Sequence, residues 1–270
     1  MKMQNKVIVV TGAGSGIGRA LTLKLVAMGA KVAAVDLNPD TLAETVNLAG
    51  SNKRKISTHI VNVSDKGAVD NLPQAVINAH GTVDGLINNA GIIQPFVKLA
   101  DLDDKIIERV LNVNLYGVIY MTRAFLPHLL KRPEAHITNV SSMGGFFPVP
   151  GQTIYGASKA AVKLMTEGLY AELIDTNVGV TVVFPGAIAT NITENSGVDM
   201  PAAAADMENA SPMRATSAED AAQAIIDGIE RDKFQVYVGN DAKLMNVFYR
   251  ISPLRATKFM YNQMKGLLSQ

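Results

Sequence analysis

The run KVIVVTGAGSGIG at residues 6–18 decides the fold. Its first six residues, Lys6 to Thr11, form a short run rich in β-branched residues, which is typical of a buried strand. Glycines then occupy positions 12, 14, 16 and 18, and the following RALTLKLVAMGA has helical periodicity. Glycines let a ligand approach the backbone, and the N-terminus of a helix favours negative charge. The run therefore predicts a phosphate-binding turn, with the spacing T-G-x-x-x-G-x-G rather than G-x-G-x-x-G.

Five further strands with helical segments between them follow this unit. They are predicted at residues 31–35, 55–61, 83–87, 136–140 and 179–184, and a last strand is expected at 235–238 after a helix over 218–231. Alternating strands and helices indicate an α/β fold with one doubly wound parallel sheet and helices on both faces. We expect a single domain over residues 1–240, with ligands at the carboxyl ends of the strands.

Asp36 ends the second predicted strand, 18 residues after Gly18. An acid at this point can accept hydrogen bonds from the hydroxyls of an adenosine ribose, and it repels a 2′-phosphate. Neither Ser15 nor Leu37 supplies a compensating cation, so the sequence favours NAD over NADP. The alternative is that Asp36 only caps the helix that begins near Pro39.

Polar residues or glycines end the other strands as well. Asn62 follows the third strand, and Ser64 is a good N-cap for the helix after it. Asn88 and Asn89 end the fourth strand, where buried amides need partners, so a structural role is natural for at least one of them.

Tyr155 and Lys159 lie four residues apart, on one face of a predicted helix that runs to about residue 176. A neighbouring ammonium lowers the pKa of a phenol from its usual value near ~10. We therefore predict a proton donor tuned toward neutral pH. By itself the pair is also compatible with a solvated helix face.

The composition excludes several classes of protein. The net charge of +1 offers no field for nucleic acid, and the absence of cysteine excludes disulfides and thiolate chemistry. The four histidines show no metal-ligand spacing, so no metal is expected. No window is apolar enough to span a membrane, and the N-terminus does not read as a signal peptide. The expected location is cytoplasmic.

Over residues 5–240 the chain resembles the short-chain dehydrogenase/reductase family, a family of NAD(P)-dependent oxidoreductases with a Rossmann fold. The resemblance rests on Thr11–Gly18, Asn88-Asn89-Ala90-Gly91, Asn114, Ser142, Tyr155 with Lys159, and Pro185-Gly186 followed by Thr190. The family's serine lies 13 residues before its tyrosine, which selects Ser142 over Ser141. One departure is Asn62, where the family usually has an aspartate near the adenine. An amide oxygen can still accept a hydrogen bond there.

The resemblance implies which residues form the site. Catalysis would use Asn114, Ser142, Tyr155 and Lys159, and the substrate would contact Ser142, Met143 and Tyr155. The cofactor would contact Gly12, Ser15, Gly16, Ile17, Gly18, Asp36, Asn62, Val63, Asn88, Ala90, Gly91, Tyr155, Lys159, Pro185, Gly186, Ile188 and Thr190.

The resemblance also implies a mechanism. Tyr155 exchanges a proton with the oxygen of an alcohol or ketone, Ser142 holds that oxygen, and Lys159 lowers the pKa of Tyr155 and holds the nicotinamide ribose. Asn114 locally breaks helical hydrogen bonding and places a water that relays protons toward Lys159. Hydride passes between the nicotinamide and the substrate carbon.

Residues 190–216 lack clean periodicity, and we interpret them as a lid over the substrate; the alternative is a passive surface excursion. Apolar side chains would line the pocket, which favours a hydrophobic alcohol or ketone, such as a steroid-, lipid- or acyl-like molecule, over a sugar. These side chains are Met143, Phe146, Phe147, Val149 and Met200.

The tail over residues 241–270 is basic and amphipathic. After Asp241 there are five cations and no acid. One helical stripe is formed by Leu244, Val247, Phe248 and Ile251 and is broken by Pro253, and a second is formed by Met260, Met264 and Leu267. The tail either docks on its own or a partner subunit, or touches an anionic membrane or a lipid-like substrate.

Two other functions are compatible with this fold. An NAD-bound regulatory or scaffold protein would need no turnover, but such proteins typically lose the tyrosine or lysine, and both are present here. A sugar-nucleotide epimerase or dehydratase would usually have a longer C-terminal substrate domain and another glycine spacing. By analogy with the fold we expect a homodimer or homotetramer.

Overall fold

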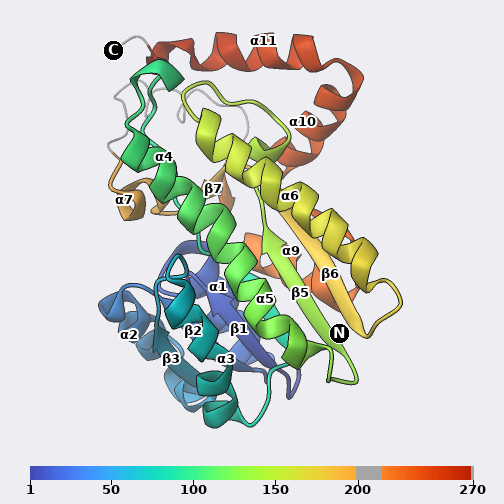
Figure 1. Cartoon of the computed structure of the whole chain (residues 1–270). Coiled ribbons are helices and arrows are strands. Elements are labelled where there is room, and N and C mark those ends of the chain that lie inside the picture. The colour runs from blue at the N-terminus through green and yellow to red at the C-terminus, as the bar shows by residue number, and fades with distance from the viewer. Residues whose placement is uncertain (199–214, 269–270) are drawn as a thin grey trace.

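Seven parallel strands form one sheet in a computed structural model of the chain, which describes residues 1–198 and 215–268. The strand order is β3-β2-β1-β4-β5-β6-β9 (Figure 1). The strands are β1 Val7–Thr11, β2 Lys31–Asp36, β3 Ile56–Ile60, β4 Gly85–Asn88, β5 Ala135–Val140, β6 Val178–Pro185 and β9 Gln235–Val238. The doubly wound parallel sheet expected from the sequence is confirmed, and its order reverses between β1 and β4.

Helices connect these strands and cover both faces of the sheet. On one face, Leu21 and Leu25 of α1 pack with Ile225 and Ile229 of α9 against β1 and β2. On the other face, α3, α5 and α6 pack around Phe125 and Leu129. The α-helices are α1 Gly16–Ala27, α2 Pro39–Leu48, α3 Lys66–His80, α4 Asp104–Leu111, α5 Gly117–Leu129, α6 Thr153–Leu173, α7 Ile192–Ser196, α9 Ala218–Glu230, α10 Asn240–Ile251 and α11 Pro253–Met264.

Shorter elements complete the chain. Two-residue strands β7 (Ile188–Ala189) and β8 (Thr216–Ser217) pair with each other. Between α4 and α5 the turn η3, Asn112–Tyr116, is a π-helix. The 3-10 turns are η1 Gly50–Lys55, η2 Leu99–Asp101, η4 Met143–Gly145 and η5 Lys265–Leu268.

The N-cap predicted for α3 is wrong by one residue. The side chain of Asp65, not that of Ser64, accepts a hydrogen bond from the backbone of Ala68 at 3.1 Å. The Ser64 hydroxyl instead donates to Oδ1 of Asn62 at 2.8 Å, since Asn62 begins a turn that shifts the helix start by one position. Both side chains are good caps, so propensity alone could not separate them.

The last two helices, α10 and α11, lie against the rest of the chain at one end of the molecule (Figure 1). Pro253 breaks the stripe of α10 as expected, and it also begins α11 as an N1 proline. Phe248 turns inward to a small core with Met245 and Ala256, whereas the rest of its predicted stripe is exposed. Within the described residues, every helix is too short or too polar to cross a bilayer.

Candidate active site

The glycine turn between β1 and α1 leaves room for a bound anion. A Cβ atom at Gly18 would collide with the carbonyl oxygen of Gly12, and Gly12 and Gly16 have φ of +67° and +50°. Helix α1 begins at Gly16, with no acid in its first turn and no side-chain cap from Ser15. The free N–H groups of this turn, with the helix dipole behind them, fit the diphosphate of a dinucleotide.

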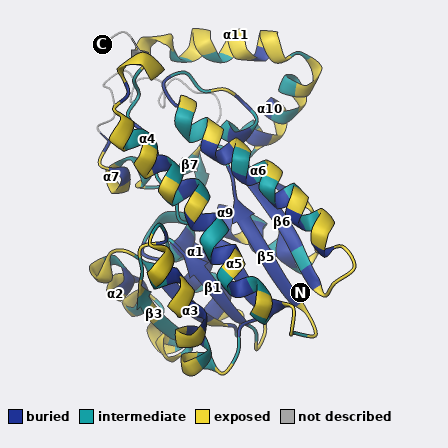
Figure 2. Cartoon of the chain, in the orientation of Figure 1, coloured by how far each residue is buried: buried dark blue, intermediate teal, exposed yellow. Residues whose placement is uncertain are grey.

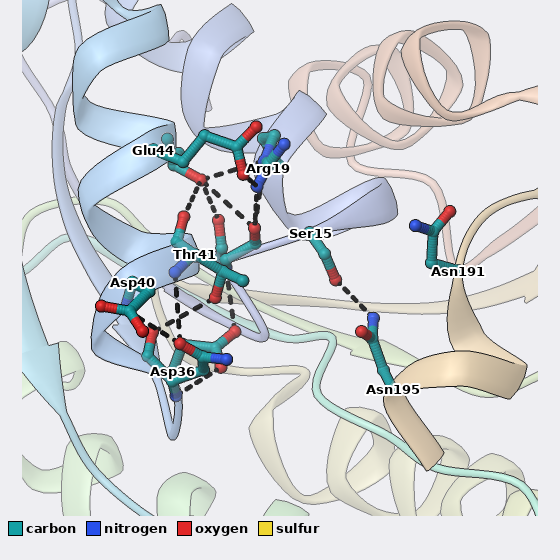
Figure 3. Close-up of polar contacts among 12 residues, drawn as sticks. Ser15, Arg19, Asp36, Asp40, Thr41, Glu44, Asn191 and Asn195 are labelled. Carbon is teal, nitrogen blue, oxygen red and sulfur yellow. Dashed lines mark hydrogen bonds and ion pairs between the residues drawn. The ribbon is translucent and has the colours of Figure 1, made fainter. Parts of the chain in front are cut away.

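The carboxylate of Asp36 lies at this turn. Its Oδ2 accepts from the backbone N–H of Gly14 at 2.9 Å, and its Oδ1 accepts from that of Asn38 at 3.1 Å. The cap of α2 is Asn38, whose Oδ1 accepts from two backbone N–H groups of the first turn. Asp36 is therefore not the helix cap, and it joins the end of β2 to the glycine turn (Figure 3).

Arg19, the cation nearest to this turn in sequence, already has partners. Its Nη2 forms an ion pair with Oε2 of Glu44 at 2.6 Å and donates to the carbonyl of Gly14 at 2.6 Å. Its Nε donates to the same carbonyl at 3.0 Å (Figure 3). The guanidinium of Arg19 therefore stabilises the glycine turn through its hydrogen bonds to the Gly14 carbonyl.

A contact that the sequence did not indicate links the turn to α7. Nδ2 of Asn195 donates to the hydroxyl of Ser15 at 2.8 Å (Figure 3). The neighbouring Ser196 is buried, and its hydroxyl accepts from the backbone of Ile93 at 3.0 Å. Helix α7 thus joins the glycine turn to the segment after β4. Thr190 lies beside Gly16, where an added Cβ would be 3.1 Å from its methyl group.

The end of β3 places Asn62 at the surface and buries Val63. Oδ1 of Asn62 accepts from both the backbone N–H and the hydroxyl of Ser64, at 3.0 and 2.8 Å. Its oxygen is therefore already bonded, contrary to the expectation that it would be available to an adenine. The amide nitrogen is the group that could donate to an adenine acceptor.

The two asparagines that follow Ile87 have different roles. Nδ2 of Asn88 donates to Oδ1 of Asn139 at 2.8 Å and to the hydroxyl of Thr122 at 3.2 Å. The Asn88 side chain is buried in this network, so a cofactor contact there would have to come from its backbone. Asn89 donates from Nδ2 to the carbonyl of Thr11, and the backbone of Ala90 donates to the Thr11 hydroxyl, which joins β4 to β1.

Asn114 lies in the π-helix η3 and is fully buried. Its side chain accepts from the backbone N–H of Ile92 and donates to the carbonyl of the same residue, both at 2.9 Å. Nδ2 also donates to the hydroxyl of Ser158 on α6 at 3.1 Å. A Cβ atom at Gly91 would lie 3.1 Å from Nζ of Lys159 and 3.3 Å from Oδ1 of Asn114. Asn114 therefore lies next to Lys159, with Gly91, which has no side chain, beside both.

Adjacent serines end β5, and the structure separates their roles. The hydroxyl of Ser141 is buried and donates to the carbonyl of Lys159 at 2.7 Å, which attaches β5 to α6. Ser142 accepts from the backbone of Gly144 at 3.0 Å and forms a side-chain hydrogen bond with Tyr155. Only Ser142 therefore presents its hydroxyl to the phenol.

The prediction that Lys159 lowers the pKa of Tyr155 does not agree with the structure. Burial is the largest influence and raises the pKa of the Tyr155 phenol, while the hydrogen bond with Ser142 acts in the opposite direction. Nζ of Lys159 donates to the carbonyl of Val140 at 3.0 Å, and burial lowers the pKa of Lys159 to about 8. The phenol is therefore protonated at neutral pH.

Gln94 positions the start of α6, and sequence analysis missed it. This residue is fully buried in the segment after β4. Its Oε1 accepts from the backbone N–H groups of Ile154 and Tyr155 at 2.9 and 3.0 Å, and its Nε2 donates to the carbonyl of Gly151. It satisfies two of the free N–H groups in the first turn of the helix that carries Tyr155.

The turn after β6 contains the predicted residues Pro185, Gly186 and Ile188. A second residue that sequence analysis missed, Asp241, holds this turn: its Oδ2 accepts from the backbone N–H of Ala187 at 2.6 Å. A Cβ atom at Gly186 would collide with this carboxylate. Asp241 lies in the first turn of α10, so the C-terminal helices are attached directly to this strand end.

Apolar residues next to Ser142 pack against those helices. Met143, Phe146 and Phe147 form a cluster with Met245 and Phe248. Phe147 is fully buried, with its ring 6.0 Å from that of Tyr249. Met200 and most of the predicted lid lie outside the described residues.

Comparison with known proteins identifies the family. Residues 6–201 match the family model described as "short chain dehydrogenase". The chain belongs to this family. Among curated members, it is 39% identical over 255 residues to the putative oxidoreductase SadH of Mycobacterium tuberculosis, covering 92% of this chain and 91% of that protein. This short-chain dehydrogenase is an oxidoreductase that uses a nicotinamide cofactor.

Solved structures of the family superimpose on nearly the whole chain. A short-chain dehydrogenase/reductase of Burkholderia phymatum in complex with NAD is 29% identical, with a TM-score of 0.83, covering 94% of this chain and 96% of that one. A short-chain dehydrogenase of Burkholderia cenocepacia in complex with NADP is 25% identical, with a TM-score of 0.80 and coverage of 96% and 99%.

Proposed function

We propose that the protein interconverts a hydrophobic secondary alcohol and its ketone with NAD. The observation that carries this proposal is the hydrogen bond between Ser142 and Tyr155, at the end of β5 and beside the buried Lys159. A phenol and a hydroxyl that lie next to each other can both donate hydrogen bonds to the same carbonyl oxygen. The four residue types that the family uses for its chemistry are all present, and Asn114 lies next to Lys159 while Ser142 lies next to Tyr155.

Each residue has a role in the reduction. The chemistry that a bound nicotinamide supplies is the donation or acceptance of a hydride. Tyr155 donates its phenolic proton to the carbonyl oxygen, and the hydroxyl of Ser142 stabilises the negative charge that develops there. Lys159 binds the nicotinamide ribose with its ammonium group. Asn114 fixes the π-helix that adjoins Lys159, where a proton relay to solvent begins.

The preference for NAD rests on the charges around the glycine turn. Asp36 accepts a hydrogen bond from the backbone of Gly14 at the glycine turn, and from there its carboxylate could accept hydrogen bonds from the ribose hydroxyls of the cofactor. The guanidinium of Arg19 is neutralised by Glu44 and bonded to a carbonyl. A 2′-phosphate would therefore meet a carboxylate and a cation that is already paired.

The hydrophobic substrate rests on the surroundings of Ser142. The aromatic and methionine side chains of residues 143–147 continue into the cluster with α10. A pocket that is lined by apolar side chains and contains one polar group favours apolar molecules with a single hydroxyl or carbonyl group. An alcohol or ketone of steroid, lipid or acyl type satisfies this description better than a sugar does.

Two experiments test the proposal. Titration with NADH and NADPH, followed by nucleotide fluorescence, should show at least tenfold tighter binding of NADH, which corresponds to about 1.4 kcal/mol. Tighter NADPH binding would contradict the role of Asp36. The variant Tyr155→Phe should bind NADH normally but should not reduce any ketone that the native enzyme reduces, whereas unchanged turnover would refute the assigned proton donor.

A further inference from the structure

The helices α10 and α11 have an inner and an outer face. Ala242, Met245 and Ala256 are buried on the inner face against the loop after β5. The outer face points away from the sheet, and Figure 2 shows α11 exposed along most of its length at one end of the molecule. This packing buries the apolar residues of the inner face, but it does not cover those of the outer face.

The outer face is rich in large apolar side chains. Six of the 16 exposed large hydrophobic residues in the described part of the chain lie between positions 244 and 261. On α10 they recur at helical spacing, at Leu244 (54% exposed), Val247 (53%) and Ile251 (78%). Leu254 (66%) and Tyr261 (53%) continue the pattern on α11. Exposed apolar residues gathered in this way mark an interaction surface rather than random exposure.

Cations accompany these side chains. Of the 25 lysines and arginines of the chain, five follow Asp241, and none of the 24 acidic residues does. Lys258 of α11 and Lys265, which begins η5, share one face with Leu254 and Tyr261, because these residues are spaced by three or four. Among the described residues, no salt bridge joins any of the five cations to an acid.

We propose that this outer face, which runs over residues 243–265 from α10 through α11 to the start of η5, binds the surface of an anionic membrane. An amphipathic helix binds a bilayer when its apolar residues enter the interface while lysines and arginines meet anionic headgroups. A second copy of the chain fits this face less well, since a two-fold interface would pair a surface that carries cations and no acid with an identical surface. Nucleic acid would satisfy the cations but would leave the leucines and the isoleucine exposed.

The test is co-sedimentation of the full chain with two kinds of vesicle, phosphatidylcholine alone and phosphatidylcholine with phosphatidylglycerol. We expect the protein to bind the anionic vesicles, and added salt to weaken binding. One variant combines Leu244→Gln, Val247→Gln and Ile251→Gln. A second combines Lys243→Gln, Arg255→Gln and Lys258→Gln. Both variants should bind the anionic vesicles more weakly than the native chain. Each lost cation should weaken binding roughly fivefold, so the second variant should lose about 100-fold.

Matched controls use exposed residues at the other end of the fold. Leu48→Gln with Ile60→Gln removes exposed apolar side chains near β3, and Lys53→Gln with Arg54→Gln removes exposed cations. These variants should bind the vesicles like the native chain. Circular dichroism and thermal melting establish that each variant folds.

Three results would overturn the proposal. The first is equal sedimentation of the native chain and both outer-face variants. The second is the absence of binding to anionic vesicles. The third is a loss of oligomer in the outer-face variants, measured by light scattering, without vesicle binding by the native chain, which would identify a second copy as the partner.

Discussion

Oδ2 of Asp241 accepts a hydrogen bond from the backbone N–H of Ala187 at 2.6 Å. The bond joins the first turn of α10 to the turn after β6, where the resemblance to the family places the carboxamide end of the cofactor. Both Gly186 and Gly239 lie so close to the carboxylate that neither position has room for a side chain. The C-terminal helices are thus part of the active-site frame.

Removal of this carboxylate should loosen the turn after β6. We expect Asp241→Ala to raise KM for the cofactor by about tenfold, because a lost charge-assisted hydrogen bond costs roughly 1.5–3 kcal/mol. Asp241→Asn keeps an acceptor and should restore most of the affinity. Steady-state kinetics with varied cofactor measure this, with Lys243→Ala as the control on the same helix. If all three variants had the native KM, Asp241 would not position the turn.

Gln94 should act through the orientation of Tyr155. Gln94→Ala leaves the backbone N–H groups of Ile154 and Tyr155 without their acceptor. A buried donor without a partner costs about 1–3 kcal/mol, so we expect kcat to fall by roughly tenfold or more with little change in cofactor binding. Gln94→Glu retains the acceptor but not the donor to Gly151, and it should be less impaired in kcat.

The readout that separates positioning from loss of folding is kcat per folded molecule. A destabilised enzyme would lose active molecules and melt earlier, but its folded fraction would keep the native KM and pH profile. A misplaced phenol would lower kcat per folded molecule. Equal kcat per folded molecule in Gln94→Ala and the native enzyme would contradict the positioning role.

The sheet was predictable because most strands are short runs rich in β-branched residues, such as VIVVT at positions 7–11, that are followed by glycine or a polar residue. Pairing the strands in parallel brings these ends to one edge, which places Gly12, Asp36 and Ser142 at one site. The same rule, applied to the last strand, would have indicated Asp241, which lies three residues after Val238.

Other features depend on tertiary contacts. Gln94 lies in an irregular segment without periodicity, and only the fold brings it to the start of α6. The inward turn of Phe248 and the burial of the Asn88 side chain are likewise set by packing. The pKa of Tyr155 could not be predicted from the spacing to Lys159, because burial of the phenol outweighs the hydrogen bond that lowers its pKa.

Lys159 should impose an upper pH limit on ketone reduction. Burial lowers the pKa of Lys159 to about 8, so its positive charge is lost as the pH rises through that value, while the raised pKa keeps Tyr155 protonated. We expect the rate of reduction to fall above about pH 8. The variant Ser142→Ala should be slower but should show the same pH limit, since it retains the lysine. A rate that stays constant to pH 10 would contradict this assignment.

His136 should make the fold sensitive to acid. The residue is buried, its Nε2 lies 2.8 Å from the hydroxyl of Thr181, and that hydroxyl donates to the carbonyl of Lys233. Because the hydroxyl proton is already committed, Nε2 of the neutral ring is the donor to Thr181. Burial, followed by the positive N-terminus, lowers the pKa of His136 to about 3, and Glu134 opposes this weakly.

The sign of the effect follows from the protons bound in each state. Between pH 6.5 and about pH 3 the unfolded chain binds a proton at His136 that the folded chain does not bind, so stability falls as the pH falls through this window. At pH 4.5 the loss is roughly 2–3 kcal/mol. His136→Gln should be less stable than the native protein at pH 7.5 but should lose less stability on acidification. Urea unfolding at both pH values measures this, with His128→Gln as the control. His59 and His80, whose pKa values burial also lowers, contribute equally in both proteins. An unchanged acid dependence in His136→Gln would show that His136 is not the group responsible.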